Sequence, residues 1–221
     1  MLEVRQMPLG PLQTNAYLLA CDETYAAAIV DPSWNGRGIV AAADEAGFEI
    51  TAILLTHAHF DHVGGLAEVK ELTGAPIYLH ADAVEMLRDA TMSAALFGMR
   101  FPSPPPPDES LTDGQWLAIG NLEVQVLYTP GHAPGHVSFH LPKYRTIFDG
   151  DVLFEGSVGR TDLPGGDYET LMATIRDRLL TLPDETRVFS GHGNPTTIGD
   201  ERAHNPFLRD LKTGGEAAGA P

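Results

Sequence analysis

Apolar positions along the chain change their spacing from one segment to the next. Short β-type runs at residues 2–7, 15–20 and 26–30, separated by turn sequences such as PLGPLQT and CDET, predict a meander of three strands. Helical and strand spacing then alternate, which is typical of layered β and α structure. The elements expected in this stretch are a helix over 38–46, a strand over 51–55, a helix over 63–72, a strand over 76–79 and a helix over 82–97.

A run of four prolines, within the sequence FPSPPPPDES, interrupts this pattern near residues 102–110. Proline disfavours helix and central strand alike, so we interpret the segment as the join between two halves of a single domain that spans 1–212. The chain then ends on 213–221, where the lack of large apolar residues predicts a disordered tail. The elements expected in the second half are strands over 115–118, 123–128, 137–141, 146–148 and 187–190, a helix over 168–180 and a short helix over 206–212. Two such halves predict a sandwich of two sheets with helices outside.

Composition and charge narrow the classes of protein that this pattern can represent. Of 221 residues, 43% are hydrophobic and 20% are charged, which indicates a globular protein that buries its own core. The 30 acidic residues outnumber the 14 basic ones, for a net charge of −16. Because such a chain repels phosphate backbones and anionic lipid, we expect neither a nucleic-acid partner nor a membrane partner.

Cysteine use and hydropathy indicate the compartment. The single cysteine, Cys21, cannot form an internal disulfide, and residues 1–10 lack the basic start and apolar run of a secretory signal. No run of apolar residues reaches the roughly 18 that a membrane helix needs. We therefore expect a cytoplasmic protein.

The candidate chemistry begins where an apolar strand, TAILLT, runs directly into HAHFDH. Four metal-competent side chains at the end of a buried strand are costly unless they bind something. Residues two apart in an extended turn project to the same side, so His57 and His59 can hold one ion. Asp61 and His62, where the chain turns into a helix, can hold another. The length of the pattern favours a metal site over a solvated polar loop.

Metal-competent residues beside glycine follow three more predicted strands, in YTPGHAPGH, FDGD and FSGHG. These donors complete two ligand sets and a bridge: His57, His59 and His132 for one ion, Asp61, His62 and His192 for the second, and Asp151 between them. Histidine and carboxylate donors accept zinc, iron or manganese. The expected cofactor is a pair of divalent ions, with zinc as the preferred metal.

The motifs THAHFDH, GHAPGH, GD at Asp151 and GHG at His192 together resemble the metallo-β-lactamase superfamily, over nearly the whole chain from residue 8 to 208. The resemblance implies an α/β fold, a four-layer αββα sandwich of two mixed sheets with a dinuclear site at one edge. The usual ligands of that family agree with the sets above. More narrowly, PLGPLQTNAYLL, GRTDLPGGDY and GHGNPTTIGDERAHNPF are similar to short bacterial hydrolases of the glyoxalase II type. This similarity implies a thioester hydrolase acting on an S-acylglutathione such as S-lactoylglutathione.

The two ions fit a hydrolytic reaction. Divalent ions polarise a carbonyl and lower the pKa of a bound water to about 7, so a nucleophile is available at neutral pH. Two such ions outweigh the charges of Asp61, Asp151 and a hydroxide, which leaves a positive site inside an acidic protein. That charge favours an anionic or carbonyl substrate, and Asp61 is the candidate to take the remaining proton.

Residues around the ligands have competing interpretations. Arg160, in the loop GSVGRTDLPGG, matches a basic residue that holds a glutathione carboxylate in glyoxalase II. An ion pair with Asp162 that shapes the loop is the alternative, because glyoxalase II has an aromatic residue at that place. We expect Asp31 to support the ligand loop and His136 to have a structural role.

A persulfide dioxygenase is the main alternative function, because that group of enzymes shares the fold, the HxHxDH motif and a GRTD loop. It would hold a single iron with His57, His132 and Asp151, whereas this sequence also keeps His192. A β-lactamase is disfavoured because its second ion usually takes a cysteine where Asp151 stands. A non-catalytic binding module is disfavoured because every expected ligand is present.

Overall fold

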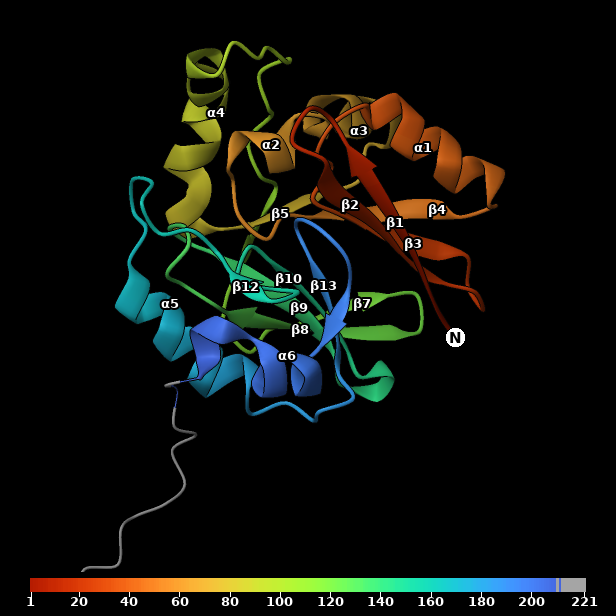
Figure 1. Cartoon of the computed structure of the whole chain (residues 1–221). Coiled ribbons are helices and arrows are strands. Elements are labelled where there is room, and N and C mark those ends of the chain that lie inside the picture. The colour runs from red at the N-terminus through yellow and green to blue at the C-terminus, as the bar shows by residue number, and fades with distance from the viewer. Residues whose placement is uncertain (210, 212–221) are drawn as a thin grey trace, which may run out of the picture.

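Two mixed β-sheets lie face to face, and helices cover the outer side of each (Figure 1). The computed structural model describes residues 1–209 and 211, so the predicted tail over 213–221 lies outside the described residues. Each large sheet has six strands. The αββα sandwich predicted from the sequence is confirmed.

The first sheet contains the N-terminal strands in chain order. Neighbours are antiparallel from β1 to β3 and parallel from β3 to β6. Its strands are β1 (Leu2–Leu9), β2 (Thr14–Cys21), β3 (Ala26–Val30), β4 (Glu49–Leu54), β5 (Ile77–His80) and β6 (Glu109–Leu111). The helices on its outer side are α1 (Gly36–Glu45), α2 (Phe60–Val63), α3 (Leu66–Thr73) and α4 (Val84–Leu96).

The second sheet has the strand order β14-β13-β10-β9-β8-β7, in which β10 and β13 are parallel and the other neighbours antiparallel. Its strands are β7 (Trp116–Ile119), β8 (Leu122–Tyr128), β9 (Val137–Leu141), β10 (Thr146–Gly150), β13 (Arg187–Ser190) and β14 (Thr196–Thr197). A small hairpin, β11 (Leu153–Phe154) and β12 (Ser157–Val158), follows β10. The helices α5 (Tyr168–Thr174) and α6 (Ile198–His204) lie on its outer side (Figure 1).

Apolar side chains form three layers of core, and β2 shows how strand alternation supplies them. Leu18 packs into the layer under α1, α3 and α4, whereas Tyr17 and Leu19 point into the layer between the sheets. Because both faces of β2 are covered, all of its residues are buried. This explains why the strand reads as a continuous apolar run after Asn15.

The predicted helix over 63–72 corresponds to α3, which begins only at Leu66, and a short helix that was not predicted, α2, ends at Val63. Gly64 and Gly65 lie at the break between the two. A Cβ on Gly64 would lie 2.4 Å from the carbonyl oxygen of Ser33, so glycine is required where the two segments cross closely. The break allows α2 to end near the sheet edge while α3 packs against α1.

The helix predicted over 168–180 begins as expected and then changes its geometry. The Asp167 carboxylate caps it by accepting the Thr170 N–H at 2.7 Å. After α5 the chain continues as a π-helical turn, Ile175–Leu179. The predicted helix over 206–212 is a short 3₁₀ turn, Pro206–Leu208, and residues 210 and 212 lie outside the described residues.

Several short elements are absent from the sequence prediction, namely β6, the β11–β12 hairpin, β14 and α6. Such strands are too short to show an alternating pattern. Helix α6 has one deeply buried apolar residue, Ile198, and its other fully buried residue is Glu201. None of the helices in the described part of the chain is both long and apolar enough to span a membrane.

Candidate metal centre

Four loops that follow strands β4, β8, β10 and β13 meet at one edge of the sandwich. They bring together all of the ligand candidates predicted from the sequence. Three groups of three side chains lie close enough together to hold an ion, and two of them consist only of predicted ligands: a first ligand group of His57, His59 and His132, and a second ligand group of Asp61, His62 and His192. In the third, Asp31, His57 and His62, the Asp31 carboxylate already accepts a hydrogen bond from His62. The remaining candidate, Asp151, lies between the groups.

Three ring nitrogens converge in the first ligand group. His59 Nδ1 lies 3.0 Å from His57 Nε2 and 2.9 Å from His132 Nε2. The outer nitrogen of His132, Nδ1, donates to the carbonyl oxygen of Arg160 at 2.8 Å, and a carbonyl can only accept. His132 Nε2 is therefore the nitrogen with the lone pair, and it points inward.

The hydrogen-bond partners of His57 determine in the same way which of its ring nitrogens carries the hydrogen. Its Nδ1 lies 3.0 Å from Thr56 Oγ1, whose own hydrogen is given to Asp31 at 2.6 Å. The hydroxyl oxygen of Thr56 therefore accepts from His57 Nδ1, and His57 Nε2 is left with a lone pair toward the group.

Burial keeps the imidazoles of this group uncharged. Desolvation lowers the pKa of His57 well below its usual value and lowers that of His59 to about 4, with the neighbouring histidines adding to the shift. Burial also lowers the pKa of His132, against the opposing charge of Asp151. The lone pairs of His57 Nε2 and His132 Nε2 both face His59 Nδ1, which as part of a neutral imidazole can donate to only one of them, whereas a cation among the three nitrogens would bind all of their lone pairs.

The second ligand group adds a carboxylate. Asp61 Oδ2 lies 3.3 Å from His192 Nε2 and 3.6 Å from His62 Nε2, and it accepts a hydrogen bond from Thr14 Oγ1 at 2.8 Å. Although burial opposes ionisation, His62 and His192 bring the pKa of Asp61 down to about 2. Burial likewise opposes a charge on His62, yet Asp151 and Asp61 raise the pKa of His62 well above its usual value. The second ligand group therefore favours positive charge at its centre.

The Asp151 carboxylate faces both groups, and its Oδ2 approaches a member of each. Its Oδ1 lies 3.4 Å from His62 Nε2, while its Oδ2 lies 3.5 Å from His132 Nε2 and 3.6 Å from His192 Nε2. A Cβ on Gly191 would lie 2.1 Å from Asp151 Oδ1, so only glycine leaves room for this carboxylate.

Two buried polar atoms at the centre have no hydrogen-bond partner in the described chain: His62 Nε2 and Asp151 Oδ1. Leaving a buried polar atom unpaired costs about 1–3 kcal/mol, more for a charged group. The two atoms lie 3.4 Å apart, and both are good ligands for a divalent ion. The donor set therefore fits a pair of metal ions.

Residues behind the ligands hold their orientation. The Asp31 carboxylate accepts the N–H of Thr56 at 2.8 Å and the Nδ1–H of His62 at 3.0 Å, so it supports the ligand loop as predicted. His136 Nε2 accepts the backbone N–H of Asp151 at 3.2 Å, and its Nδ1 lies 2.9 Å from Thr129 Oγ1. His136 thus has the structural role expected of it.

Arg160 contributes to the centre through its backbone. Its carbonyl holds His132, whereas its guanidinium forms two hydrogen bonds of 2.7 Å with the Asp162 carboxylate. Both side chains are more than half exposed. The ion pair considered as the alternative in the sequence is therefore formed, next to the first ligand group.

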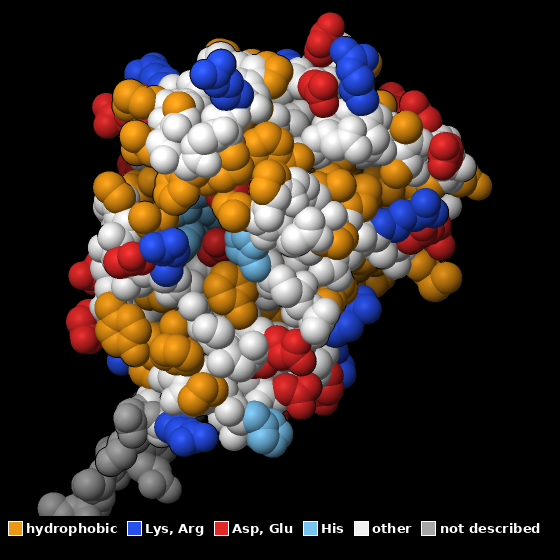
Figure 2. All heavy atoms as spheres, turned by 45° about the horizontal axis from the view of Figure 1, so that its top comes forward, with side chains coloured by type: hydrophobic (Ala, Val, Ile, Leu, Met, Phe, Trp, Pro, Cys, Tyr) orange, Lys and Arg blue, Asp and Glu red, His pale blue; other side chains and the backbone are white. Residues whose placement is uncertain are grey.

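The centre opens onto a hollow. Figure 2 shows histidine side chains with an acidic side chain between them at the bottom of a depression bordered by hydrophobic side chains. One of the aromatic rings near the ligands is Phe154, whose ring centroid lies 6.2 Å from that of His192. A substrate that reaches the ligands therefore also contacts apolar surface.

Thr14 and Thr56 are supporting residues that the sequence analysis missed. The Thr14 hydroxyl donates to Asp61, and the Thr56 hydroxyl donates to Asp31. In each pair the two residues lie far apart in the sequence. The available signal was a polar pair, Thr14 and Asn15, at the start of an otherwise apolar strand.

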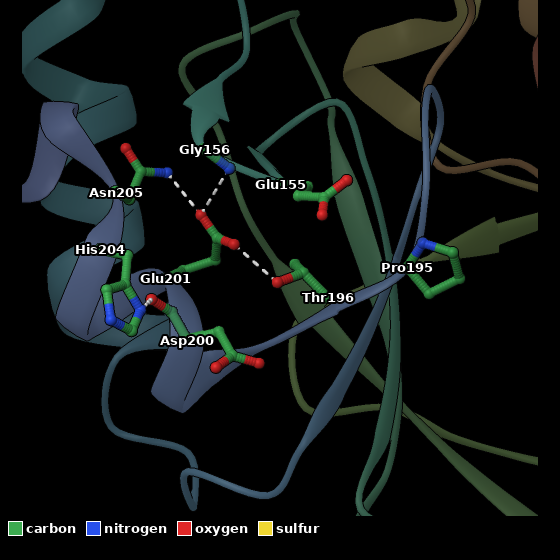
Figure 3. Close-up of a pocket in the computed structure, with 8 residues that line it drawn as sticks. All are labelled: Glu155, Gly156, Pro195, Thr196, Asp200, Glu201, His204 and Asn205. Carbon is green, nitrogen blue, oxygen red and sulfur yellow. Dashed lines mark hydrogen bonds between the residues drawn. The ribbon is translucent and has the colours of Figure 1, made fainter.

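A second polar cavity, of about 330 Å³, lies beside α6 (Figure 3). Its central carboxylate, Glu201, accepts hydrogen bonds from Gly156 N–H at 2.9 Å, Asn205 Nδ2 at 2.8 Å and Thr196 Oγ1 at 2.6 Å. Both carboxylate oxygens of Glu201 are thus satisfied by the chain. We call Glu201 and these three partners the Glu201 cluster.

Known proteins with similar sequences cover almost the whole chain. "Probable metallo-hydrolase YqgX" of Bacillus subtilis is 45% identical over 206 residues, which are 92% of this chain and 96% of that protein. "Hydroxyacylglutathione hydrolase GloC" of Haemophilus influenzae is 36% identical over 209 residues, which are 94% of this chain and 98% of that protein.

Solved structures agree with the observed fold. BLEG-1, titled a B3 metallo-beta-lactamase, has a TM-score of 0.88 at 44% identity, covering 94% of this chain and 100% of that one. TTHA1623 in a di-iron-bound form has a TM-score of 0.86 at 45% identity, covering 92% and 100%. ETHE1 from Myxococcus xanthus has a TM-score of 0.78 at 27% identity, covering 92% and 83%.

A family model agrees with both comparisons. The model described as the metallo-beta-lactamase superfamily matches residues 9–192, a range that contains every ligand candidate at the edge of the sandwich. The chain belongs to the metallo-beta-lactamase superfamily.

Proposed function

We propose that the chain is a dinuclear metal-dependent hydrolase of the glyoxalase II type, which cleaves S-acylglutathione, such as S-lactoylglutathione, to glutathione and a hydroxy acid. The observation that carries the proposal is the position of Asp151, whose carboxylate lies within 3.6 Å of His132 in the first ligand group and of His62 and His192 in the second. A carboxylate in that position is suited to bridge a pair of ions. The similarity to a hydroxyacylglutathione hydrolase supports the substrate class.

The first ion would be held by the first ligand group and the second ion by the second ligand group, with Asp151 shared. We propose zinc as the metal, because three imidazoles, or two imidazoles and a carboxylate, form a set of donors that zinc accepts well. Iron and manganese accept the same donors, and a similar chain has been solved in a di-iron form.

When bound, the ions would polarise the thioester carbonyl and lower the pKa of a water molecule. The reaction adds water to the carbonyl carbon and breaks the carbon–sulfur bond, and the thiolate receives a proton. Asp61 remains ionised at neutral pH because His62 and His192 lower its pKa to about 2. Such a weak base can carry a proton only briefly, so we propose that Asp61 relays the proton of the water toward the leaving thiolate.

Arg160 is the proposed contact for a glutathione carboxylate. Its guanidinium is exposed and its backbone touches the first ligand group, so a carboxylate held there would lie close to the ions. Asp162 accepts hydrogen bonds from Nε and Nη2 of Arg160, and the remaining N–H groups of the guanidinium can donate to a substrate carboxylate. Because Asp162 already neutralises part of the charge, the gain would be smaller than that of a whole ion pair. We propose a cytoplasmic location, which the buried and unpaired thiol of Cys21 fits.

A persulfide dioxygenase is the second candidate, favoured by the likeness to ETHE1. That function would use one iron on His57, His132 and Asp151, and it would make no use of Asp61 or His192. The close approach of Asp61 Oδ2 to His192 Nε2, at 3.3 Å, favours the hydrolase, because it completes a second ligand group.

The deciding experiment counts ions and measures three reactions on the same purified sample. We expect about two ions per chain, cleavage of S-lactoylglutathione, no oxygen uptake with glutathione persulfide and no hydrolysis of a β-lactam. One iron per chain with rapid oxygen uptake would identify the dioxygenase instead. Hydrolysis of the β-lactam without thioester cleavage would also contradict the proposal, in the direction of BLEG-1.

A further inference from the structure

The start of β2 reaches from the first sheet to the loop that carries His192 in the second sheet. The Asn15 N–H donates to Gly191 O at 2.7 Å, and Asn15 Nδ2 donates to Ser190 O at 2.9 Å and to Gly193 O at 3.0 Å. The Tyr17 hydroxyl donates to Ser190 O at 2.6 Å. These bonds bind the backbone on both sides of His192.

Thr14 contacts Asp61, which belongs to the second ligand group together with His192. Its hydroxyl donates to Asp61 Oδ2 at 2.8 Å, and this is the oxygen that lies 3.3 Å from His192 Nε2. The backbone of Thr14 also pairs with His192 in an isolated β-bridge. Thr14 is fully buried, and its carbonyl accepts the hydroxyl of Ser33 at 3.1 Å, so its position is itself fixed.

The second ligand group needs such support because its members come from different sheets. Asp61 and His62 lie in α2, over the first sheet, whereas His192 follows β13 of the second sheet. The His192 side chain is 32% exposed, while that of His62 is fully buried. Core packing therefore fixes His62 but does not by itself fix His192.

We propose that Thr14, Asn15 and Tyr17 form a clamp that positions Asp61 and His192 and thereby sets the affinity of the second ion. We call these three residues the β2 clamp. The first ligand group is independent of it, because His57 and His132 are oriented by Thr56 and by the Arg160 carbonyl. The inference rests on the proposed dinuclear function.

The test uses two variants that remove one hydrogen bond each and keep the volume of the side chain. Thr14→Val removes the donor to Asp61, and Tyr17→Phe removes the donor to Ser190 while the ring keeps its edge contacts with Phe148 and Phe189. Thr14→Ser restores the hydroxyl.

Thr146→Val is the matched control. Thr146 is also fully buried, but its hydroxyl bonds to Tyr144 O at the opposite end of β10 from Asp151. Each variant is loaded with zinc and equilibrated against chelators of graded strength, and zinc per chain is then measured.

We expect the second ion to be released about ten to a hundredfold more readily from Thr14→Val and Tyr17→Phe, with the first ion unchanged. Thr14→Ser and Thr146→Val should hold both ions as the wild-type chain does. In the cobalt-loaded forms, the two clamp variants should change the absorption of the second cobalt while that of the first stays the same.

Wild-type affinity for both ions in Thr14→Val and Tyr17→Phe would overturn the clamp, and so would equal weakening of both ions or an equal loss in Thr146→Val. A wild-type chain that binds one ion overturns the dinuclear function, and the clamp with it. Two ions in the wild-type chain and unchanged variants overturn the clamp alone.

Discussion

The metal centre and the Glu201 cluster both bury carboxylates beside the second sheet, but they differ in how those carboxylates are satisfied. Asp151 is 7% exposed and Glu201 is 3% exposed. Asp151 Oδ1 has no partner in the described chain, whereas both oxygens of Glu201 accept hydrogen bonds from it (Figure 3). Burial of an acidic group therefore does not by itself mark a binding site, whereas unpartnered buried atoms that lie among other metal-competent side chains point to one.

This difference separates two roles. The Glu201 cluster ties α6 to the turn between β11 and β12 and to β14, so its expected effect is on stability. In the candidate metal centre, inward-facing ligand atoms have no partner in the described chain. Substitutions there are therefore expected to change ion binding and activity. The predictions below test whether each region keeps to its own role.

The largest effect is expected from Asp151→Ala. Because Asp151 faces both ligand groups, its loss removes a shared ligand and leaves two cations with less charge between them. We expect most of both ions to be lost and thioesterase activity to fall at least about a thousandfold. Elemental analysis and steady-state kinetics measure this. If the variant keeps both ions, Asp151 is not the bridge.

Glu201→Ala should reduce the stability of the protein and leave its ion content unchanged. It leaves the Gly156 N–H, the Thr196 hydroxyl and the Asn205 amide without their acceptor, and we expect the free energy of unfolding to fall by about 3 kcal/mol. The folded protein should still bind two ions per chain. Glu71→Ala, at an exposed position of α3, is the control and should change stability little. If folded Glu201→Ala lost ions, the Glu201 cluster would affect ion binding as well as stability, and the two regions would not have separate roles.

His192→Ala should leave the first ion in place and release the second. Zinc content is expected to fall from about two toward one per chain, with thioesterase activity about a hundredfold lower because one of the two cations is missing. Asp61→Ala should behave similarly. His204→Ala, which removes an exposed histidine of α6, is the control. Full activity in a sample with one ion per chain would contradict the dinuclear mechanism.

Low pH should reduce the stability of the metal-free protein, because His59 of the first ligand group is held neutral in the folded state. Burial lowers the pKa of His59 from 6.5 to about 4, so the unfolded chain binds a proton at His59 more readily than the folded one. The stability from a neutral His59 is present above pH 6.5 and is lost as the pH falls toward 4. We expect His59 to account for about 2 kcal/mol of lost stability between about pH 7 and pH 5.

Denaturant unfolding of the metal-free wild-type chain and of His59→Gln at both pH values isolates that contribution. The variant should lose less stability on acidification than the wild-type chain. Equal losses in the two proteins would show that His59 is not held neutral by its surroundings.

The smallest effect is expected at Arg160. If its guanidinium holds a substrate carboxylate, Arg160→Ala should raise KM for a glutathione thioester about tenfold, with ion content unchanged and little effect on a thioester without carboxylates. Asp162→Ala frees the guanidinium and should not raise KM for the glutathione thioester. Equal losses on both substrates, imitated by Asp162→Ala, would mean that the ion pair only shapes the loop.

Local sequence was enough to predict which metal-competent side chains meet at the edge of the sandwich, but it identified only some of the residues that support them. His57, His59, Asp61 and His62 lie in one continuous motif after an apolar strand, so a single strand end brings them together. The strands themselves follow from apolar alternation, as β2 illustrates. The fold class was predicted because both signals extend over many residues.

Long-range hydrogen bonds could not be predicted from local sequence patterns. The bond from Thr14 to Asp61 joins residues 47 positions apart, and Glu201 meets the Gly156 N–H across 45 positions. Such pairs depend on how the sheets pack, which spacing does not encode. Strand β14 and helix α6 were missed for a related reason, because contacts with distant segments stabilise them more than their own apolar pattern does.

The proline-rich connector between α4 and β6 also divides the ligand sets. The half before it carries His57, His59, Asp61 and His62, and the half after it carries His132, Asp151 and His192. Neither ligand group is complete in one half. If the chain were expressed as two separate polypeptides cut at this connector, neither would contain either ligand group in full, and uptake of two zinc ions per pair of polypeptides would report their reassembly.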